Sequence, residues 1–86
     1  CNDDLAQGAV FQCMQRRITV PDRLAIVGFH DLPGSEWAAT PLTTVRTPRT
    51  RIGQEAARML IDRIEGRLDG PASLDLGFSI VRRASA

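Results

Sequence analysis

Lysine is absent from this sequence, and all 11 basic residues are arginines. They are spread along the chain without forming a block, and 10 acidic residues leave a net charge of +1. Proteins that bind nucleic acids or membrane surfaces usually carry a basic patch, and the total charge of this chain gives no indication of one. Aromatic residues are also sparse, at 5%.

Cysteines and long apolar runs are equally scarce. Two cysteines do not make the disulfide framework of a small secreted domain. We expect Cys13 to be a small apolar residue packed on a buried helix face. No segment approaches the roughly 20 apolar residues of a membrane-spanning helix, and no signal peptide is recognisable. These features favour a cytoplasmic protein.

Motifs of catalysis are missing as well. The chain has one histidine, no Gly-x-Ser-x-Gly, no glycine-rich phosphate loop and no cluster of metal ligands. Asp3 and Asp4 are adjacent, but neighbouring residues at a helix start point in different directions, so they do not form a catalytic pair. The helix dipole accounts for them instead. The sequence therefore predicts no enzyme, no cofactor and no metal.

Two segments have apolar residues at the helical period. The first runs from about Asp3 to Gln15, with Asn2 as the expected N-cap. Gly8 inside it costs about 1 kcal/mol relative to alanine, which suggests close approach of another backbone. The second helix has Thr47 as its expected N-cap and Pro48 at its first position. Its expected core stripe consists of Ile52, Ala56, Ala57, Met59, Leu60, Ile61 and Ile64.

Three further segments resemble strands. The continuous apolar run Leu24–Phe29, after a helix and a short loop, is typical of a buried parallel strand. Leu42–Arg46 and about Leu74–Val81 are expected to be two more strands. Residues 32–40 are expected to be irregular or to form a short helix around residues 35–39. Because helices alternate with apolar strands, the pattern predicts a layered α/β fold with a sheet flanked by helices.

Five blocks, in order, resemble the LacI/GalR family of bacterial transcription repressors, and together they cover nearly the whole chain. The family patterns are N-D-x-x-A-x-G-A, V-P-x-D-(hydrophobic)-x-V-x-G-(F/Y)-D-D, P-P-L-T-T-(V/I), G-x-x-A-x-x-L-L and L-V-x-R-x-S. In this sequence they correspond to Asn2–Ala9, Val20–Asp31, Pro41–Val45, Gly53–Ile61 and Leu76–Ser85.

The resemblance implies the C-terminal part of a two-lobed effector-binding domain with a type I periplasmic-binding-protein-like fold. Residues 1–41 would belong to the C-terminal lobe, residues 42–70 would cross to the N-terminal lobe, and residues 71–86 would return. It further implies a homodimer that binds operator DNA through an N-terminal helix-turn-helix, which these 86 residues do not contain. We expect the chain to be a fragment of such a regulator.

The same resemblance indicates a ligand site. Ligands in open α/β sheets bind beyond the carboxyl ends of the strands. His30 follows the expected strand Leu24–Phe29, and Asn2 follows a strand that we infer to precede Cys1. The family usually has an aspartate at the position of His30, where it binds sugar hydroxyls. A histidine can donate a hydrogen bond and carry positive charge, so it suits a sugar acid. The sequence is similar to gluconate-responsive members, and Arg49 would supply a second cation.

Each of these residues also has a simpler explanation. Asn2 caps a helix whether or not it binds a ligand. His30 is explained equally as a polar residue at a strand end, and Arg49 as a solvated surface residue. Asp31 fits an Asx-type turn better than a ligand contact.

Trp37 has three possible roles. It could stack on a sugar ring, pack under its loop, or anchor the dimer interface, where tryptophan is enriched. The resemblance favours the interface, because the family dimerises through this stretch and the first helix. Ala6 and Ala38 would then be the neighbours of Trp37 in that interface.

Three other functions remain open. One is a periplasmic sugar-binding protein for transport with the same fold, although the Pro41–Val45 block favours the regulator. Another is a flavodoxin-like enzyme whose nucleophile or cofactor loop lies upstream. The third is a fragment with no activity of its own that only associates.

Overall fold

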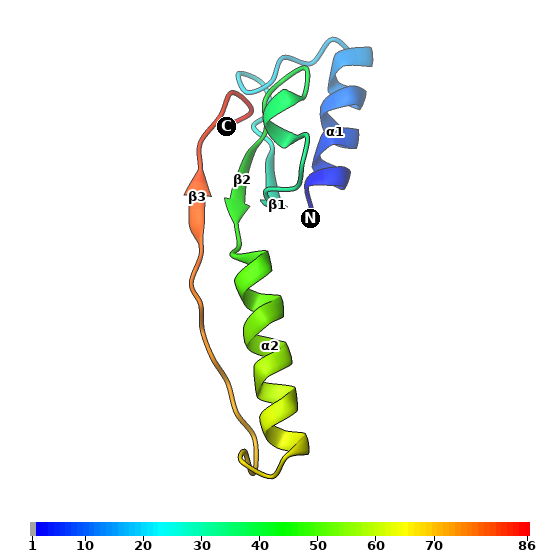
Figure 1. The fold of residues 1–86 in the computed structure, drawn as a ribbon. Helices are drawn as coiled ribbons and strands as arrows, with labels where there is room; N and C mark the ends of the chain where they lie inside the picture. Colours follow the sequence, from blue (N-terminus) through cyan, green and yellow to red (C-terminus); the bar gives the residue numbers. More distant parts are fainter. Residues whose placement is uncertain (1) are drawn as a thin grey trace. The chain divides into compact units, whose positions relative to one another are not determined.

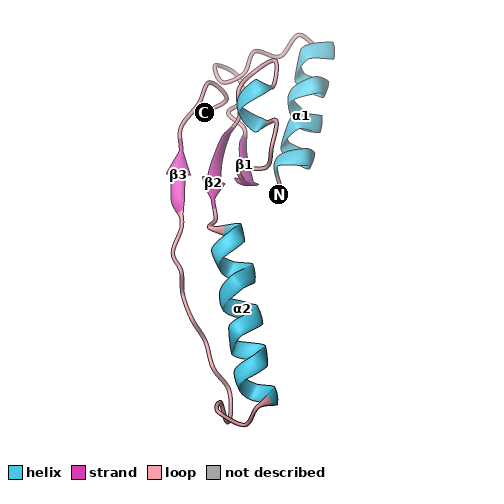
Figure 2. Ribbon diagram, viewed as in Figure 1, coloured by secondary structure: helices cyan, strands magenta, loops and turns pink. Residues whose placement is uncertain are grey.

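The fold alternates helices and strands, as expected, and the computed structural model describes residues 2–86 (Figures 1 and 2). The elements are α1 (Asp3–Gln15), β1 (Val27–His30), the short 3-10 helix η1 (Ser35–Trp37), β2 (Thr43–Arg46), α2 (Arg49–Ile64) and β3 (Ser79–Val81). They fall into two compact units. One comprises the chain up to Thr47 together with Phe78–Ala86, and the other is Pro48–Gly77.

Helix α1 has the bounds that its apolar period predicts, Asp3–Gln15. The predicted N-cap is confirmed, because Asn2 Oδ1 accepts a hydrogen bond of 3.0 Å from the backbone N–H of Leu5. The buried face of α1 includes Cys13, also as expected. This face forms the hydrophobic core of its unit with two residues from the strand region; the core residues are Ala6, Val10, Cys13, Ile26 and Leu42.

The sheet has the order β1-β2-β3 and is mixed. β1 and β2 are parallel, as predicted, with Val27 opposite Thr43. β3 is antiparallel to β2, with Thr44 opposite Val81, so the sheet is not wholly parallel. β3 is also shorter than the expected 74–81, because Gly77 has a positive φ of 77° and its N–H donates to Asp75 Oδ1 in a local turn.

The apolar run before His30 is buried on one face only. Ile26 and Gly28 are buried, whereas Val27 and Phe29 are 49% and 42% exposed. Successive side chains of a strand point to opposite faces of the sheet, and α1 packs against the Ile26 face. The expectation of a strand buried on both faces is therefore wrong for the residues that the structure describes.

Two expectations for α2 are also wrong. Its N-cap is Pro48, with no side-chain cap hydrogen bond, and Thr47 lies one residue earlier with its hydroxyl 3.4 Å from Nδ1 of His30. No residue of α2 is buried. Met59 is half-buried, and the rest of the predicted apolar stripe is exposed, up to 75% at Ile64. The spacing of the apolar residues predicted the position of α2 correctly, but no other helix or strand of the described chain covers the apolar face of this helix.

A buried carboxylate joins the start of α1 to the strand ends. The Asp3 side chain is fully buried, and its Oδ2 accepts hydrogen bonds from the hydroxyl of Ser35 and, at 2.7 Å, from the N–H of Leu32. Its Oδ1 accepts from the hydroxyl of Thr44 at 2.6 Å. One side chain thus connects α1, the loop after β1, and β2, a role that the helix dipole alone does not explain.

Hydrogen bonding decides the ionisation of this carboxylate. Burial raises the pKa of Asp3, but hydrogen bonds from Ser35, Thr44 and the Leu32 backbone lower it, and the net result is a pKa below the ordinary 3.8. Because the folded-state pKa is the lower one, the carboxylate's contribution to stability is present above pH 3.8. It is lost as the pH falls through the folded-state pKa.

Gly28 is the glycine that the packing requires. A Cβ at this position would lie 2.1 Å from Oδ1 of Asp3 and 3.0 Å from Cδ2 of Leu42. Apart from its chain neighbours and the backbone of its own helix, a Cβ at Gly8 would have no described atom within 4 Å, so the close approach of another backbone predicted there is wrong for the described residues. The tight contact is instead between β1 and the buried carboxylate.

We expect Gly28→Ala to lower the free energy of unfolding by at least about 2 kcal/mol, because the new methyl group must displace a carboxylate held by three hydrogen bonds. Gly8→Ala is the matched control and should raise stability by about 0.5–1 kcal/mol through helix propensity. Urea unfolding followed by circular dichroism measures both. Equal stabilities for the two variants would contradict the packing at Gly28.

We expect Asp3→Asn to lower the free energy of unfolding at pH 7 by about 2–3 kcal/mol, because it loses hydrogen bonds to a charged acceptor. Asp4→Asn, in the same helical turn but exposed, should cost less than about 1 kcal/mol. Stability measured from pH 7 downward should fall below about pH 4 in the parent and more gently in Asp3→Asn. An unchanged acid limb in Asp3→Asn would refute this role of the carboxylate.

Candidate functional site

The carboxyl ends of β1 and β2 lie side by side, because the strands are parallel and His30 is opposite Arg46. His30 is the last residue of β1 and is partly buried. Its ring meets that of Phe29 edge-on, with centroids 4.6 Å apart and planes at 75°. Its Nδ1 lies 3.4 Å from the hydroxyl oxygen of Thr47, so the imidazole and a hydroxyl share the end of the sheet.

The backbone at this point is unusual. His30 has a φ of 100° and Asp31 a φ of 56°, so two consecutive residues other than glycine adopt positive φ. Such conformations are uncommon and carry strain, and they cluster at functional sites. The turn is therefore held by the contacts around it and not by its own preference.

Asp31 supplies the strongest of those contacts. Its Oδ2 accepts from Nε of Arg46 at 2.8 Å, and its Oδ1 accepts from the guanidinium of Arg83 at 2.9 Å. Its backbone N–H donates to the hydroxyl of Thr44 at 3.3 Å. Burial raises the pKa of Asp31, but hydrogen bonds and charge from Arg83 and Arg46 lower it below the ordinary value. Asp31 is thus bound into a structural network that sequence reasoning, which favoured an Asx turn, missed.

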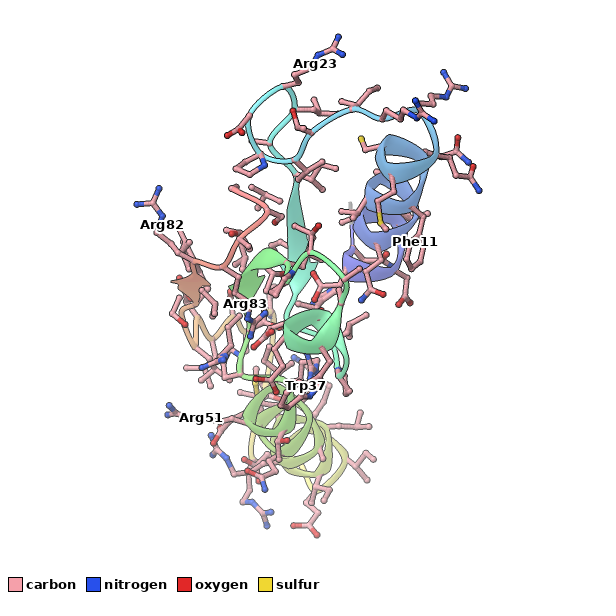
Figure 3. All side chains as sticks on the ribbon, turned by 90° about the horizontal axis from the view of Figure 1, so that it is seen from above. Phe11, Arg23, Trp37, Arg51, Arg82 and Arg83 are labelled. Atoms are coloured by element: carbon pink, nitrogen blue, oxygen red, sulfur yellow. The ribbon has the colours of Figure 1, made fainter. Side chains whose placement is uncertain are left out.

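The C-terminal tail completes this network. Arg83 also donates to the carbonyl of Leu42 at 2.9 Å. Two residues later, the buried hydroxyl of Ser85 donates to the carbonyl of Ile26 at 2.6 Å and accepts from the N–H of Thr43 at 2.8 Å. Figure 3 shows Arg83 among the strand ends, whereas Arg82 points away. The R-x-S pattern in the closing block was the available signal for these roles.

The structure brings two of the three expected ligand residues to the same edge. Asn2 is exposed at the start of α1 and directly precedes Asp3, whose carboxylate is bonded to Leu32, two residues after His30. In Figure 1 the N-terminal end of α1 lies at the carboxyl end of β1. Arg49 is exposed at the first residue of α2 and belongs to the other compact unit.

The three residues expected at a dimer interface differ in exposure. Ala6 is fully buried in the core, so its side chain has no surface for a partner. Trp37 is 81% exposed, and Ala38 is half-buried. Figure 3 shows the indole projecting from the short helix η1. Of these three residues, Trp37 and Ala38 have side-chain surface that a partner could reach.

The described residues also form hollows away from this edge of the sheet. One, of about 450 Å³, lies along the exposed face of the sheet and is lined by Val27, Thr43, Val45, Ile80, Arg82 and Ala86. Another, of about 340 Å³, lies within the second unit and is lined by Ile52, Glu55, Ala56, Met59 and residues 74–77. Neither contains Asn2, His30 or Arg49. Both are lined largely by apolar side chains of the kind expected to pack against other elements.

Residues 2–86 contain no group of three or more histidine, cysteine or carboxylate side chains arranged to hold a metal ion. Over the same residues, neither helix is both long and apolar enough to cross a membrane.

Comparison with known proteins identifies the family. The model of the periplasmic binding protein-like domain matches residues 1–86. The HTH-type transcriptional regulator GntR of Pseudomonas aeruginosa is 45% identical over 85 residues, which are 99% of this chain and 25% of that protein. The chain therefore spans about a quarter of the length of this curated relative.

Solved structures agree with this family. The crystal structure of the transcription regulator GntR from Chromobacterium violaceum is 52% identical, with a TM-score of 0.82, over 99% of this chain and 31% of that one. The complex of the transcriptional regulator CelR with cellobiose is 32% identical, with a TM-score of 0.93, over 100% of this chain and 26% of that one. The chain belongs to the family of periplasmic binding protein-like domains, which includes the effector-binding domains of LacI/GalR-type transcription regulators.

Proposed function

We propose that this chain is the effector-sensing segment of a bacterial transcription regulator, and that a sugar or sugar acid binds at the edge where His30 ends β1. The observation that carries the proposal is the joining of Asn2 and His30 to one sheet edge by the Asp3–Leu32 hydrogen bond. Carboxyl ends of strands are where ligands bind in open α/β sheets. The family membership supports the same edge.

The effector would lie between two lobes. Residues 1–41 and 71–86 would belong to the C-terminal lobe and residues 42–70 to the crossing segment. The division into two compact units supports two lobes, although its boundaries, after Thr47 and after Gly77, fall a few residues beyond the proposed crossings. In this proposal Arg49, the first residue of α2, is a further effector contact.

The chemistry of the site favours a hydroxylated acid such as gluconate. The imidazole of His30 and the hydroxyl of Thr47 supply hydrogen-bond donors, and His30 can carry the charge that attracts a carboxylate. Arg49 would add a second cation that pairs with a carboxylate in two parallel hydrogen bonds. That a related regulator was solved with cellobiose supports a carbohydrate-like effector.

Binding would regulate transcription by shifting a population. An effector that contacts both lobes favours the closed form by its difference in affinity for the two forms. In a homodimer this changes the spacing of the two helix-turn-helix heads on operator DNA, which need a fixed half-site separation. The protein would act in the cytoplasm without a cofactor or a catalytic step. A periplasmic transport role has less support, because the relatives described above are transcription regulators.

In the full-length regulator, gluconate should bind measurably by isothermal titration, and glucose and glucose 6-phosphate more weakly. His30→Asp should weaken gluconate binding at least about tenfold, because a second carboxylate then faces that of the ligand. His30→Asp should not gain affinity for glucose. If none of the three compounds binds the parent, the named effector is wrong, and His30 is then a structural residue.

Trp37→Ser should weaken the homodimer at least about tenfold, because a buried interfacial tryptophan commonly contributes more than 1.4 kcal/mol. Sedimentation velocity of the full-length protein over a dilution series measures the dissociation constant. Arg23→Ser is the control, since Arg23 is exposed in the loop before β1. A dimer of unchanged stability in Trp37→Ser would place the interface elsewhere.

A further inference from the structure

We propose that Asp31 and Arg83 are positioning residues of the effector site, and that their partly buried ion pair fixes a strained turn and so holds the His30 ring beside Thr47. The role in effector binding rests on the function proposed above. The locking of the turn rests on the geometry alone.

The turn needs stabilising contacts because its backbone conformation is unfavourable. His30 and Asp31 both have side chains, yet their φ values are 100° and 56°. A side chain at positive φ brings Cβ close to the backbone, a contact that only glycine avoids. Released from its surroundings, this segment would return to negative φ, and the imidazole would leave its place at the end of β1.

Three contacts hold Asp31, two from β2 and one from the C-terminal tail. Arg46 of β2 and Arg83 of the tail after β3 form ion pairs with its carboxylate, and the hydroxyl of Thr44 accepts a hydrogen bond from its backbone N–H. The Arg83 side chain is 14% exposed and that of Arg46 is 56% exposed, so solvent screens the Arg46 pair much more. Arg83 is therefore the principal partner.

Arg83 is itself fixed at both ends. Its backbone N–H donates to the hydroxyl of Thr43 at 2.8 Å, and its guanidinium donates to the carbonyl of Leu42 as well as to Asp31. A guanidinium anchored in this way cannot follow Asp31 if the turn relaxes. The tail after β3 thereby sets the conformation of the last residue of β1, more than 50 positions earlier in the sequence.

The first test compares two substitutions of the strained residue. His30→Gly should have a higher unfolding midpoint in urea than His30→Ala, because glycine alone relieves the positive φ. At an ordinary strand end the order is the reverse, since glycine has more conformational entropy to lose. A lower midpoint for His30→Gly would overturn the strained turn, and this comparison needs no effector.

The second test removes the lock. In the full-length regulator with ¹³C-labelled histidine, the His30 ring resonance, assigned by its loss in His30→Gln, should shift in Arg83→Gln. It should stay unchanged in Arg82→Gln, a matched control whose side chain points away from the strand ends (Figure 3). Arg83→Lys should restore the resonance in part, because it keeps the charge but not the planar fork. An unshifted resonance in Arg83→Gln would overturn the proposal.

Isothermal titration tests whether the Asp31–Arg83 ion pair affects effector binding. Well below its unfolding midpoint, Arg83→Gln should bind gluconate at least about tenfold more weakly than the parent and prefer it less over glucose. A merely structural role would lower the unfolding midpoint and leave that preference unchanged, which would overturn the positioning role. If the parent binds neither compound, the proposed effector fails, while the midpoints and the resonance still decide whether Asp31 and Arg83 lock the turn.

Discussion

The buried carboxylate of Asp3 is the interaction on which the arrangement of the first unit depends. It takes hydrogen bonds from the loop after β1 and from β2, and it occupies the space that a side chain at position 28 would fill. A charge removed from water is tolerated only when its hydrogen-bonding capacity is satisfied. Three donors meet that condition here, so helix, loop and strand must come together for the carboxylate to be buried at all.

Polar contacts have this importance because the apolar core is small. Five buried apolar residues form it, while the other face of the sheet and the apolar stripe of α2 are exposed. Hydrophobic burial is not directional, whereas the networks of Asp3, Asp31 and Ser85 fix which atoms meet. Every buried side-chain nitrogen and oxygen in the described part of the chain has a hydrogen-bond partner. Specificity in this unit therefore comes largely from hydrogen bonds.

The same networks explain how a strained site can persist. Positive φ at His30 and Asp31 is unfavourable, and ion pairs from Arg46 and Arg83 offset it. The site and the scaffold are thus not separate. The carboxylate of Asp31 directly follows the histidine that we propose for effector binding, and Arg83 of the C-terminal tail holds that carboxylate.

Local features of the sequence determined the elements and the family. The period of its apolar residues predicted the bounds of helix α1, and Asn2 was recognisable as its cap, because both depend on residues a few positions apart. The ordered motifs, each of them a short stretch of sequence, indicated the LacI/GalR resemblance. Tertiary structure decided the direction of β3, the exposure of α2 and the burial of Ala6. It also decided the partners of Asp3 and Asp31, which lie 13 to 52 positions away along the chain. Composition and periodicity do not specify such contacts, because they report which face of an element is apolar and not which distant atom completes a hydrogen bond.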